Sequence, residues 1–258
     1  MIVFNTDLDN TMIFSYKHDI GEHKRCAEIY QGREISFITD RTFELLKKVT
    51  QLVLFVPTTT RTIEQYNRID LGIGIPKYAL VCNGGVLLID GKEDERWYAD
   101  SLKMTADCTD ELKKAEEVLA VDAHRSFEVR NIRNLFVFTK SEEPQKSVEN
   151  LKGRLNTEKM DVFSTGVKVY AVPKSLGKGI AVERLRTRLK PERVIAAGDS
   201  EFDISMLKKA DIPIAPEELV RISDLPKNTI VSNGEIFSEF VLRNVLEFAQ
   251  NAQINASL

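Results

Sequence analysis

The sequence predicts an α/β protein with a mostly parallel sheet core that is interrupted by an inserted α+β unit. Near both ends of the 258-residue chain, short apolar runs alternate with amphipathic helical segments, which is typical of a parallel sheet covered on both faces. Between residues 86 and 172, hairpin turns and helices occur in runs instead, which indicates a separate α+β unit. We therefore expect residues 1–85 and 173–258 to form one core domain, and residues 86–172 to form an inserted domain.

The first part of the core is expected to contain three buried strands made of apolar residues. The apolar runs are residues 2–6, 52–56 and 78–82, and helical patterns at 39–50 and 61–69 separate them. The helix at 39–50 opens on a threonine and an aspartate, either of which can cap its first turn. Strands and helices that alternate in this way predict parallel pairing.

After residue 85, the turns Asp90-Gly91-Lys92 and Thr165-Gly166 predict antiparallel hairpins. The strands expected in the insertion are 86–89, 96–98, 126–129, 135–139, 161–164 and 168–172, and its helices are 101–119 and 144–155. From residue 177 the first pattern returns. There the expected strands are 194–197, 212–215 and 229–231, and the expected helices are 178–189, 201–209 and 237–250.

The composition argues against several classes of protein. The chain is 43% hydrophobic and 29% charged, which is ordinary for a folded soluble protein. A formal net charge of −3 argues against nucleic-acid binding, which needs a basic excess. No apolar run approaches the roughly 18 residues of a membrane-spanning helix, and no secretory signal is visible. The three cysteines are widely spaced and fit reduced thiols. We expect a cytoplasmic protein without nucleic-acid or membrane partners, and nothing indicates its oligomeric state.

The most informative residues are Asp7 and Asp9, which follow the first apolar run directly. Two carboxylates this close repel each other unless a cation lies between them or one is protonated. Mg²⁺ prefers oxygen ligands of this kind, and a carboxylate beside a metal can attack phosphorus as a nucleophile. The pattern therefore suggests metal-assisted phosphoryl transfer. The structural alternative is a strand end followed by a turn, with Asp9 or Thr11 as a cap.

Polar residues that could share a site with these carboxylates follow other expected strands. They are Thr59, Thr60 and Arg61 after the strand at 52–56, Asp199 and Asp203 after the strand at 194–197, and Lys178 at the start of the preceding helix. Ligands of open parallel sheets bind outside the carboxyl ends of the strands, so we expect these side chains to gather at one edge. Thr59 or Asp199 could instead cap a helix. Lys178 and Asp203 could be solvated charges on helix surfaces.

This set resembles the haloacid dehalogenase superfamily of phosphotransferases, and the resemblance covers essentially the whole chain. Four segments carry it, in this order: Asp7-Leu8-Asp9-Asn10-Thr11, Thr59-Thr60-Arg61, Gly177-Lys178-Gly179 and Gly198-Asp199-Ser200-Glu201-Phe202-Asp203. The insertion between the second and third segments, with Asn83-Gly84 before it, is similar to subclass IIB, which includes Cof-type and sucrose-phosphate phosphatases. The resemblance implies a Rossmann-like core, a cap domain over the site, and Mg²⁺-dependent hydrolysis of a small phosphorylated metabolite, with a sugar phosphate favoured.

The resemblance also implies a role for each motif residue. Asp7 would attack phosphorus, and Asp9 would protonate the leaving alcohol and then activate water against the aspartyl-phosphate. Thr59 would hydrogen-bond the transferring phosphoryl group, while Lys178 would neutralise both the phosphate and the crowded carboxylates. The transition state spreads negative charge over three oxygens, so positioning and cationic stabilisation do most of the catalysis.

The expected Mg²⁺ ligands are the side chains of Asp7 and Asp199 and the backbone carbonyl of Asp9, with Asp203 orienting Lys178 or a metal-bound water. The residues expected to bind substrate are Thr60, Arg61, Asn83 and Gly84, and the weaker candidates in the insertion are Arg133 and Lys140. Three residues depart from the family pattern: Thr60 replaces a glycine, Phe202 stands where asparagine is common, and Asn10 replaces the commoner glycine. Two alternative functions stay open, namely a phosphomutase of the same superfamily and a catalytically silent binding protein.

Overall fold

The computed structural model describes residues 1–256. The chain divides into two compact units, one formed by Met1–Asp94 with the chain from Gly177 onward, and the other by Glu95–Leu176. The observed boundaries differ from the expected ones at 86 and 172. The first boundary moves because the segment after residue 86 pairs with a strand of the first unit, as described below.

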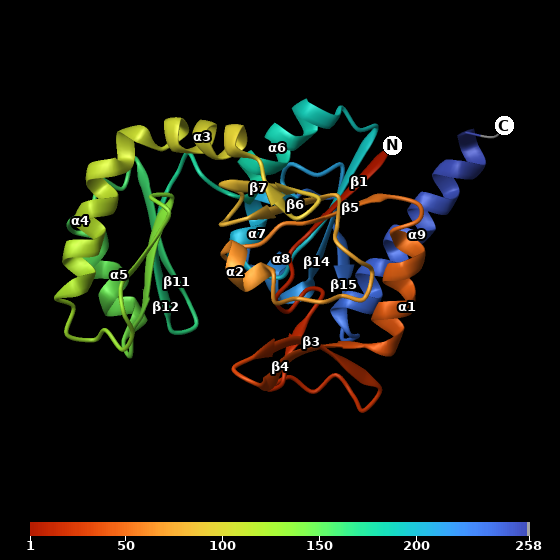
Figure 1. Ribbon diagram of the computed structural model, residues 1–258, viewed down its shortest axis with the longest axis horizontal. Helices are drawn as coiled ribbons and strands as arrows, with labels where there is room; N and C mark the ends of the chain where they lie inside the picture. The colour runs from red at the N-terminus through yellow and green to blue at the C-terminus, as the bar shows by residue number, and fades with distance from the viewer. Residues whose placement is uncertain (257–258) are drawn as a thin grey trace. The chain divides into compact units, whose positions relative to one another are not determined.

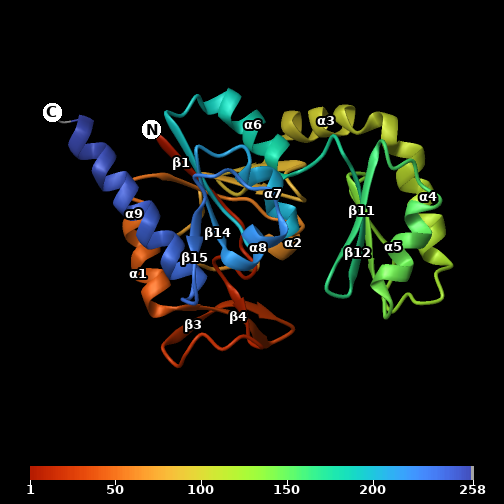
Figure 2. The same ribbon diagram turned by 180° about the vertical axis from the view of Figure 1, so that it is seen from behind.

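The first unit is built on a five-stranded parallel sheet of order β15-β14-β13-β1-β5 (Figure 1). Its strands are β1 (Ile2–Thr6), β5 (Leu54–Pro57), β13 (Arg193–Ala197), β14 (Ile212–Pro216) and β15 (Ile230–Ser232). Helices α1 (Asp40–Val49) and α9 (Phe237–Ala256) cover one face, and α6 (Lys178–Leu189), α7 (Glu201–Leu207) and α8 (Glu217–Ile222) cover the other. Figure 2 shows α7 and α8 beside β14.

Alternation along the strands explains how both faces are buried. Side chains of successive strand residues point to opposite faces of a sheet. Strand β13 accordingly packs Ile195 with Phe4 and Val245 on the α1 and α9 side. It packs Val194 with Val182 on the α6 side. The continuous apolar runs of the sequence therefore predicted the core correctly.

Several core elements have the bounds that the sequence predicts. Strand β1 and helix α6 match residue for residue, and α1 begins after Thr39, whose side chain accepts a hydrogen bond from the backbone N–H of Thr42. The expected helix at 61–69 is shorter, since α2 covers only Ile63–Tyr66.

One strand prediction was wrong in its pairing. The run at 78–82 forms β6 (Tyr78–Val81), which belongs to an antiparallel sheet β6-β7-β8 instead of the parallel core. The chain reverses after β6 because Cys82, Asn83 and Gly84 all adopt positive φ, at 52°, 57° and 84°. This turn brings β7 (Val86–Ile89) back along β6, which is why residues beyond 86 belong to the first unit. A parallel bridge between Thr58 and Leu80 links β6 to the end of β5.

The prediction that residues 96–98 form the second strand of the hairpin around Asp90-Gly91 was also wrong. The partner of β7 is the two-residue strand β8 (Lys92–Glu93), and residues 96–98 lie in helix α3 (Glu95–Met104). The buried side chains of α3, Trp97 and Ser101, are four residues apart, which is a helical spacing and not a strand spacing.

A three-stranded antiparallel sheet near the N-terminus was not predicted. It consists of β2 (Phe14–Ser15), β4 (Arg33–Thr39) and β3 (Lys24–Tyr30), in that order across the sheet. Strands β3 and β4 form a hairpin around Gln31-Gly32, where both residues have positive φ. A bulge in β3 disturbs the regular alternation that would have marked this hairpin.

The second unit is an antiparallel sheet of order β11-β12-β10-β9, with helices on one face. Its elements are α3, η1 (Ala106–Cys108), α4 (Thr109–Ala120), β9 (Arg130–Ile132), β10 (Phe136–Lys140), α5 (Pro144–Lys152), β11 (Met160–Thr165) and β12 (Lys168–Pro173). The α+β character is as predicted, but the helix expected at 101–119 is broken by η1. The strand expected at 126–129 is wrong, because an isolated bridge between Arg125 and Ser141 precedes it and the continuous pairing of β9 begins only at Arg130.

The two faces of the second unit's sheet differ in chemistry. Leu119 of α4 and Leu151 of α5 pack on Val137 and Val169 of one face. On β11, β12 and β10, the rings of Phe163, Tyr170 and Phe138 follow one another at centroid distances of 5.6 and 5.7 Å.

Within residues 1–256, no helix of either unit is long and apolar enough to cross a lipid bilayer.

Candidate active site

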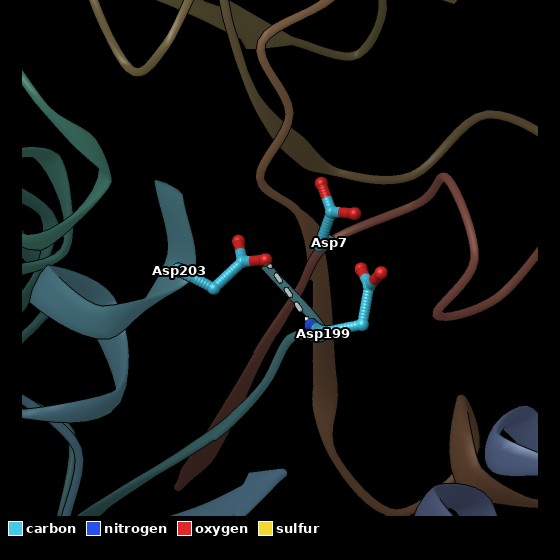
Figure 3. A group of neighbouring side chains, drawn as sticks. All are labelled: Asp7, Asp199 and Asp203. Carbon is cyan, nitrogen blue, oxygen red and sulfur yellow. Dashed lines mark hydrogen bonds between the residues drawn. The ribbon is translucent and has the colours of Figure 1, made fainter. Parts of the chain in front are cut away.

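Three carboxylates converge at the carboxyl edge of the parallel sheet. Asp7 follows β1, Asp199 follows β13, and Asp203 lies in the first turn of α7. Each offers an oxygen atom within 4.8 Å of the others (Figure 3). Their convergence follows from the pairing of β1 with β13, because Thr6 lies opposite Ala197 and both strands end at the same level.

Asp203 fixes the geometry of the turn between β13 and α7. Its Oδ2 accepts hydrogen bonds from the backbone N–H of Asp199 at 3.2 Å, and from the N–H and hydroxyl of Ser200 at 3.0 and 2.9 Å. The turn packs so closely that a Cβ on Gly198 would lie 2.3 Å from the Cβ of Asp203, so only glycine fits there. Asp203 is fully buried, so the surface alternative is wrong for this residue.

The ammonium of Lys178 lies between two of these carboxylates. Its Nζ donates to Asp7 Oδ1 at 2.5 Å and to Asp203 Oδ1 at 2.6 Å. Only 1% of the side chain is exposed, so Lys178 is not a solvated lysine. Burial alone would lower the pKa of Lys178, but the two carboxylates outweigh it and the pKa lies above its ordinary value. Lys178 therefore stays protonated.

The pKa values of two carboxyl groups are raised. Burial raises the pKa of Asp7 well above its usual range, although Lys178 opposes this, and the neighbouring aspartates add to it. Burial, followed by the charge of Asp203, raises the pKa of Asp199 to about 7. The Thr11 hydroxyl donates to Asp199 Oδ1 at 3.0 Å and favours the ionised form. The site therefore has more negative charge than Lys178 can balance.

This donor set fits Mg²⁺. All of its ligand atoms are oxygens, and its raised carboxyl pKa values mark charge that a divalent cation would neutralise. Asp203 already uses its oxygens for Lys178 and for the turn, whereas Asp7 and Asp199 have carboxylate oxygens without such bonds. Asp7 and Asp199 would therefore be the better ligands, with Asp203 as their support.

Asp9 is held by Arg61, which follows β5. Arg61 donates from Nε to Asp9 Oδ2 at 2.8 Å and from Nη2 to Asp9 Oδ1 at 2.7 Å, a two-pronged ion pair. The same Nη2 donates to Glu28 Oε2 at 2.9 Å. Sequence reasoning missed Glu28, because a single glutamate in a strand carries no signal of a site.

The remaining motif residues lie in two adjoining loops. Thr59 is buried, its Oγ1 accepts from the backbone N–H of Arg61 at 3.1 Å, and its carbonyl accepts from the N–H of Asn83 at 3.0 Å. Asn83 is also buried, and its Oδ1 has no hydrogen-bond partner within residues 1–256. A Cβ on Gly84 would lie 2.4 Å from that of Ala181, so Gly84 permits close packing on α6. Thr60 is half-buried. Substrate binding by Thr60, Arg61, Asn83 and Gly84 stays a prediction.

The basic candidates of the second unit are engaged with aromatic rings of that unit. The guanidinium of Arg133 lies 4.1 Å from the ring centre of Tyr98, and Nζ of Lys140 lies 4.8 Å from that of Phe127. Both side chains are thus held in place within the second unit.

The chain is similar to known phosphatases in sequence. The family described as haloacid dehalogenase-like hydrolase matches residues 92–218. A phosphoglycolate phosphatase of Methanopyrus kandleri is 28% identical over 172 residues, which cover 64% of this chain and 70% of that protein. A phosphoglycolate phosphatase of Sulfurisphaera tokodaii is 26% identical over 197 residues, covering 73% of this chain and 78% of that one.

Solved structures share the fold over nearly the whole length. The sucrose-phosphatase of Synechocystis, solved with sucrose and phosphate, has a TM-score of 0.57 at 13% identity and covers 97% of this chain and 98% of its own. A trehalose-6-phosphate phosphatase related protein has a TM-score of 0.53 at 14% identity, covering 99% and 100%. Taken with the four motifs in their order, these matches confirm the resemblance of the chain to the haloacid dehalogenase-like hydrolases, and its relatives in sequence are named as phosphatases.

Proposed function

We propose that the chain is a Mg²⁺-dependent phosphatase that hydrolyses a small phosphorylated metabolite, with a sugar phosphate as the favoured class. The observation that carries the proposal is the buried contact of Lys178 with Asp7, beside Asp199, at the ends of adjacent strands. The relatives named as phosphoglycolate phosphatases support a small phosphorylated metabolite as substrate, and the fold shared with a sucrose-phosphatase favours a sugar phosphate.

Each residue then has a step in the reaction. A carboxylate oxygen of Asp7 forms a bond to phosphorus while the bond to the leaving oxygen breaks. In this step Asp9 carries a proton on an oxygen lone pair that Arg61 does not use, and it donates that proton to the leaving oxygen. Asp9 next takes a proton from water, whose oxygen bonds to phosphorus while the bond between phosphorus and the Asp7 oxygen breaks, so that inorganic phosphate leaves and the Asp7 carboxylate is restored. Lys178 and the hydroxyl of Thr59 stabilise the transferring oxygens. When bound by Asp7 and Asp199, Mg²⁺ supplies positive charge that stabilises the same oxygens.

The first prediction is a strict metal requirement. Hydrolysis of 4-nitrophenyl phosphate should stop when the metal is chelated and resume when Mg²⁺ is restored, because the carboxylates then lose their counter-charge. A panel of phosphorylated metabolites assayed with Mg²⁺ would identify the substrate. Full activity in excess chelator would contradict the proposal. Steady hydrolysis would exclude the silent binding protein, and activity only with a bisphosphate activator would point to the phosphomutase.

The second prediction concerns stability and needs no turnover. The folded-state pKa of Asp199 is about 7, and the folded-state pKa of Asp7 is also raised. Above about pH 4, these two carboxyl groups therefore bind more protons in the native state than in the unfolded state. These groups therefore lower stability as the pH rises from about 4 through 7. Mg²⁺ binds the ionised form and competes with the protons. It should raise Tm more at pH 8 than at pH 5.5 in a thermal melt.

A control variant makes this melt specific. Asp110→Asn removes an exposed carboxylate from the first turn of α4 and should keep the full Mg²⁺ shift. Asp199→Asn should lose most of the shift at pH 8. An equal Mg²⁺ shift at both pH values would mean that Asp7 and Asp199 do not hold the metal.

A further inference from the structure

A fully buried carboxylate lies outside the four motifs. Glu28 is on β3, and its side chain is 0% exposed. The bulge around Glu28 shifts the register of β3, and bulges of this kind re-aim side chains beside active sites. The same segment is fastened to the chain after α2, since Glu28 bridges with Ile69 and the N–H of Asp70 donates to the carbonyl of Ala27 at 2.8 Å.

Glu28 accepts hydrogen bonds from side chains of three segments of the chain. Its Oε2 accepts from Ser36 Oγ at 3.0 Å and from Arg61 Nη2 at 2.9 Å, and its Oε1 accepts from Arg68 Nε at 3.0 Å. Burial raises the pKa of Glu28, but the bonds from Arg61, Arg68 and Ser36 outweigh burial and lower it overall. A buried carboxylate with this many donors is a fixed anchor for the cations around it.

Arg61 joins this anchor to the reacting region. Its side chain is 13% exposed, and its Nη1 also donates to the carbonyl of Gln65 at 3.3 Å. Asp9, in contrast, has a side chain that is 49% exposed, and Arg61 donates a hydrogen bond to each of its two carboxylate oxygens. Arg61 thus links the Asp9 carboxylate to the buried Glu28 by hydrogen bonds to both.

We propose that Glu28 is a positioning residue of the phosphatase reaction: through Arg61 it holds the Asp9 carboxylate where Asp9 exchanges protons with the leaving group and with water. The inference rests on the proposed function, in which Asp9 is the proton carrier. Misplacement of a catalytic group by about 1 Å can cost on the order of a hundredfold in rate. Glu28 should therefore affect kcat more than KM.

The test compares Glu28→Gln with wild type on glycerol 2-phosphate, whose alkoxide needs a proton to leave, and on 4-nitrophenyl phosphate, whose leaving group needs it less. We expect kcat for glycerol 2-phosphate to fall about tenfold or more with KM within about threefold, and a smaller loss for the aryl phosphate. In an Asp9→Asn background the same change should cost less than about twofold, because Glu28 acts only through Asp9. Arg68→Met, which removes a partner of Glu28 that does not bind Asp9, should keep kcat within about threefold of wild type.

A charge-matched variant separates positioning from simple stabilisation. Glu28→Gln leaves the cluster with one cation in excess, because Arg61 keeps Asp9 but Arg68, which is 30% exposed, loses its anion. Glu28→Gln/Arg68→Met instead removes one anion and one cation from the cluster. We expect the double variant to recover Tm but not kcat. Recovery of both would show that Glu28 only balances charge and would overturn the proposal. The double variant also serves as the kinetic test if Glu28→Gln fails to fold.

The outcomes distinguish the two proposals. Suppose that wild type hydrolyses both substrates and that Asp9→Asn is impaired. If Glu28→Gln then has normal kcat, or if it lowers kcat as much in the Asp9→Asn background as in wild type, only the positioning role fails. If wild type hydrolyses no phosphate ester, or Asp9→Asn is unimpaired, the proposed function fails and the positioning role fails with it.

Discussion

Replacement of Asp7 by asparagine is expected to reduce kcat by about 10³- to 10⁶-fold, the range seen when a nucleophile is removed from an enzyme. An amide does not form the acyl-phosphate. The fold should persist, because Asp7 lies at the end of β1 and burial already disfavours its charge, as its raised pKa shows. We expect the Tm of the metal-free variant at pH 8 to equal or exceed that of wild type.

Two measurements check this prediction. Steady-state kinetics give the loss of kcat, and mass spectrometry of acid-quenched enzyme should show a phosphoryl adduct on wild type that Asp7→Asn lacks. Asp110→Asn, an exposed change in α4, is the matched control and should keep both the rate and the adduct. A folded Asp7→Asn variant with near-normal turnover would show that Asp7 is not the nucleophile.

Replacement of Lys178 by methionine should give the second-largest effect, a loss of about a thousandfold in kcat/KM together with a loss of stability. Methionine keeps most of the volume but leaves Asp7 and Asp203 buried without their shared cation. Breaking a buried ion pair by removing one partner costs about 3–5 kcal/mol. The unpaired charge can be relieved by protonation of Asp7, whose pKa must rise further without Lys178.

The sign of the pH dependence follows from that protonation. A carboxyl group with a raised folded-state pKa lowers stability as the pH rises, so Lys178→Met should be destabilised more at pH 8 than at pH 5. Urea unfolding at both pH values measures this difference. Lys174→Met, which changes a half-exposed lysine four residues earlier, should be near-neutral in both assays. The double variant Lys178→Met/Asp203→Asn should be more stable than Lys178→Met but equally inactive. Full activity of Lys178→Met would show that Lys178 has no part in the mechanism.

The sequence by itself placed the residues of the candidate active site at one edge of the sheet. Asp7 and Asp199 directly follow apolar runs, and such runs form strands whether or not the rest of the chain is known. Parallel strands of an α/β sheet end at one edge, so the convergence of these residues with Lys178 followed from local patterns and from a general rule of topology. The helix that carries Lys178 was predicted for the same reason, because its start and its periodicity are local features.

Only the tertiary structure decided the pairing of β6 and the role of Glu28. The run that forms β6 is equally suited to a parallel strand or to a hairpin. The hairpin requires positive φ angles at Cys82 and Asn83. Because such angles are usually found at glycine, the sequence did not reveal this turn. Glu28 meets Arg61, 33 positions along the chain, and Ser36 across a bulged hairpin. Neither the burial of a carboxylate nor its choice of cation is a local property, since both depend on which segments pack together. The support of Asp9 was therefore visible only once the chain was folded.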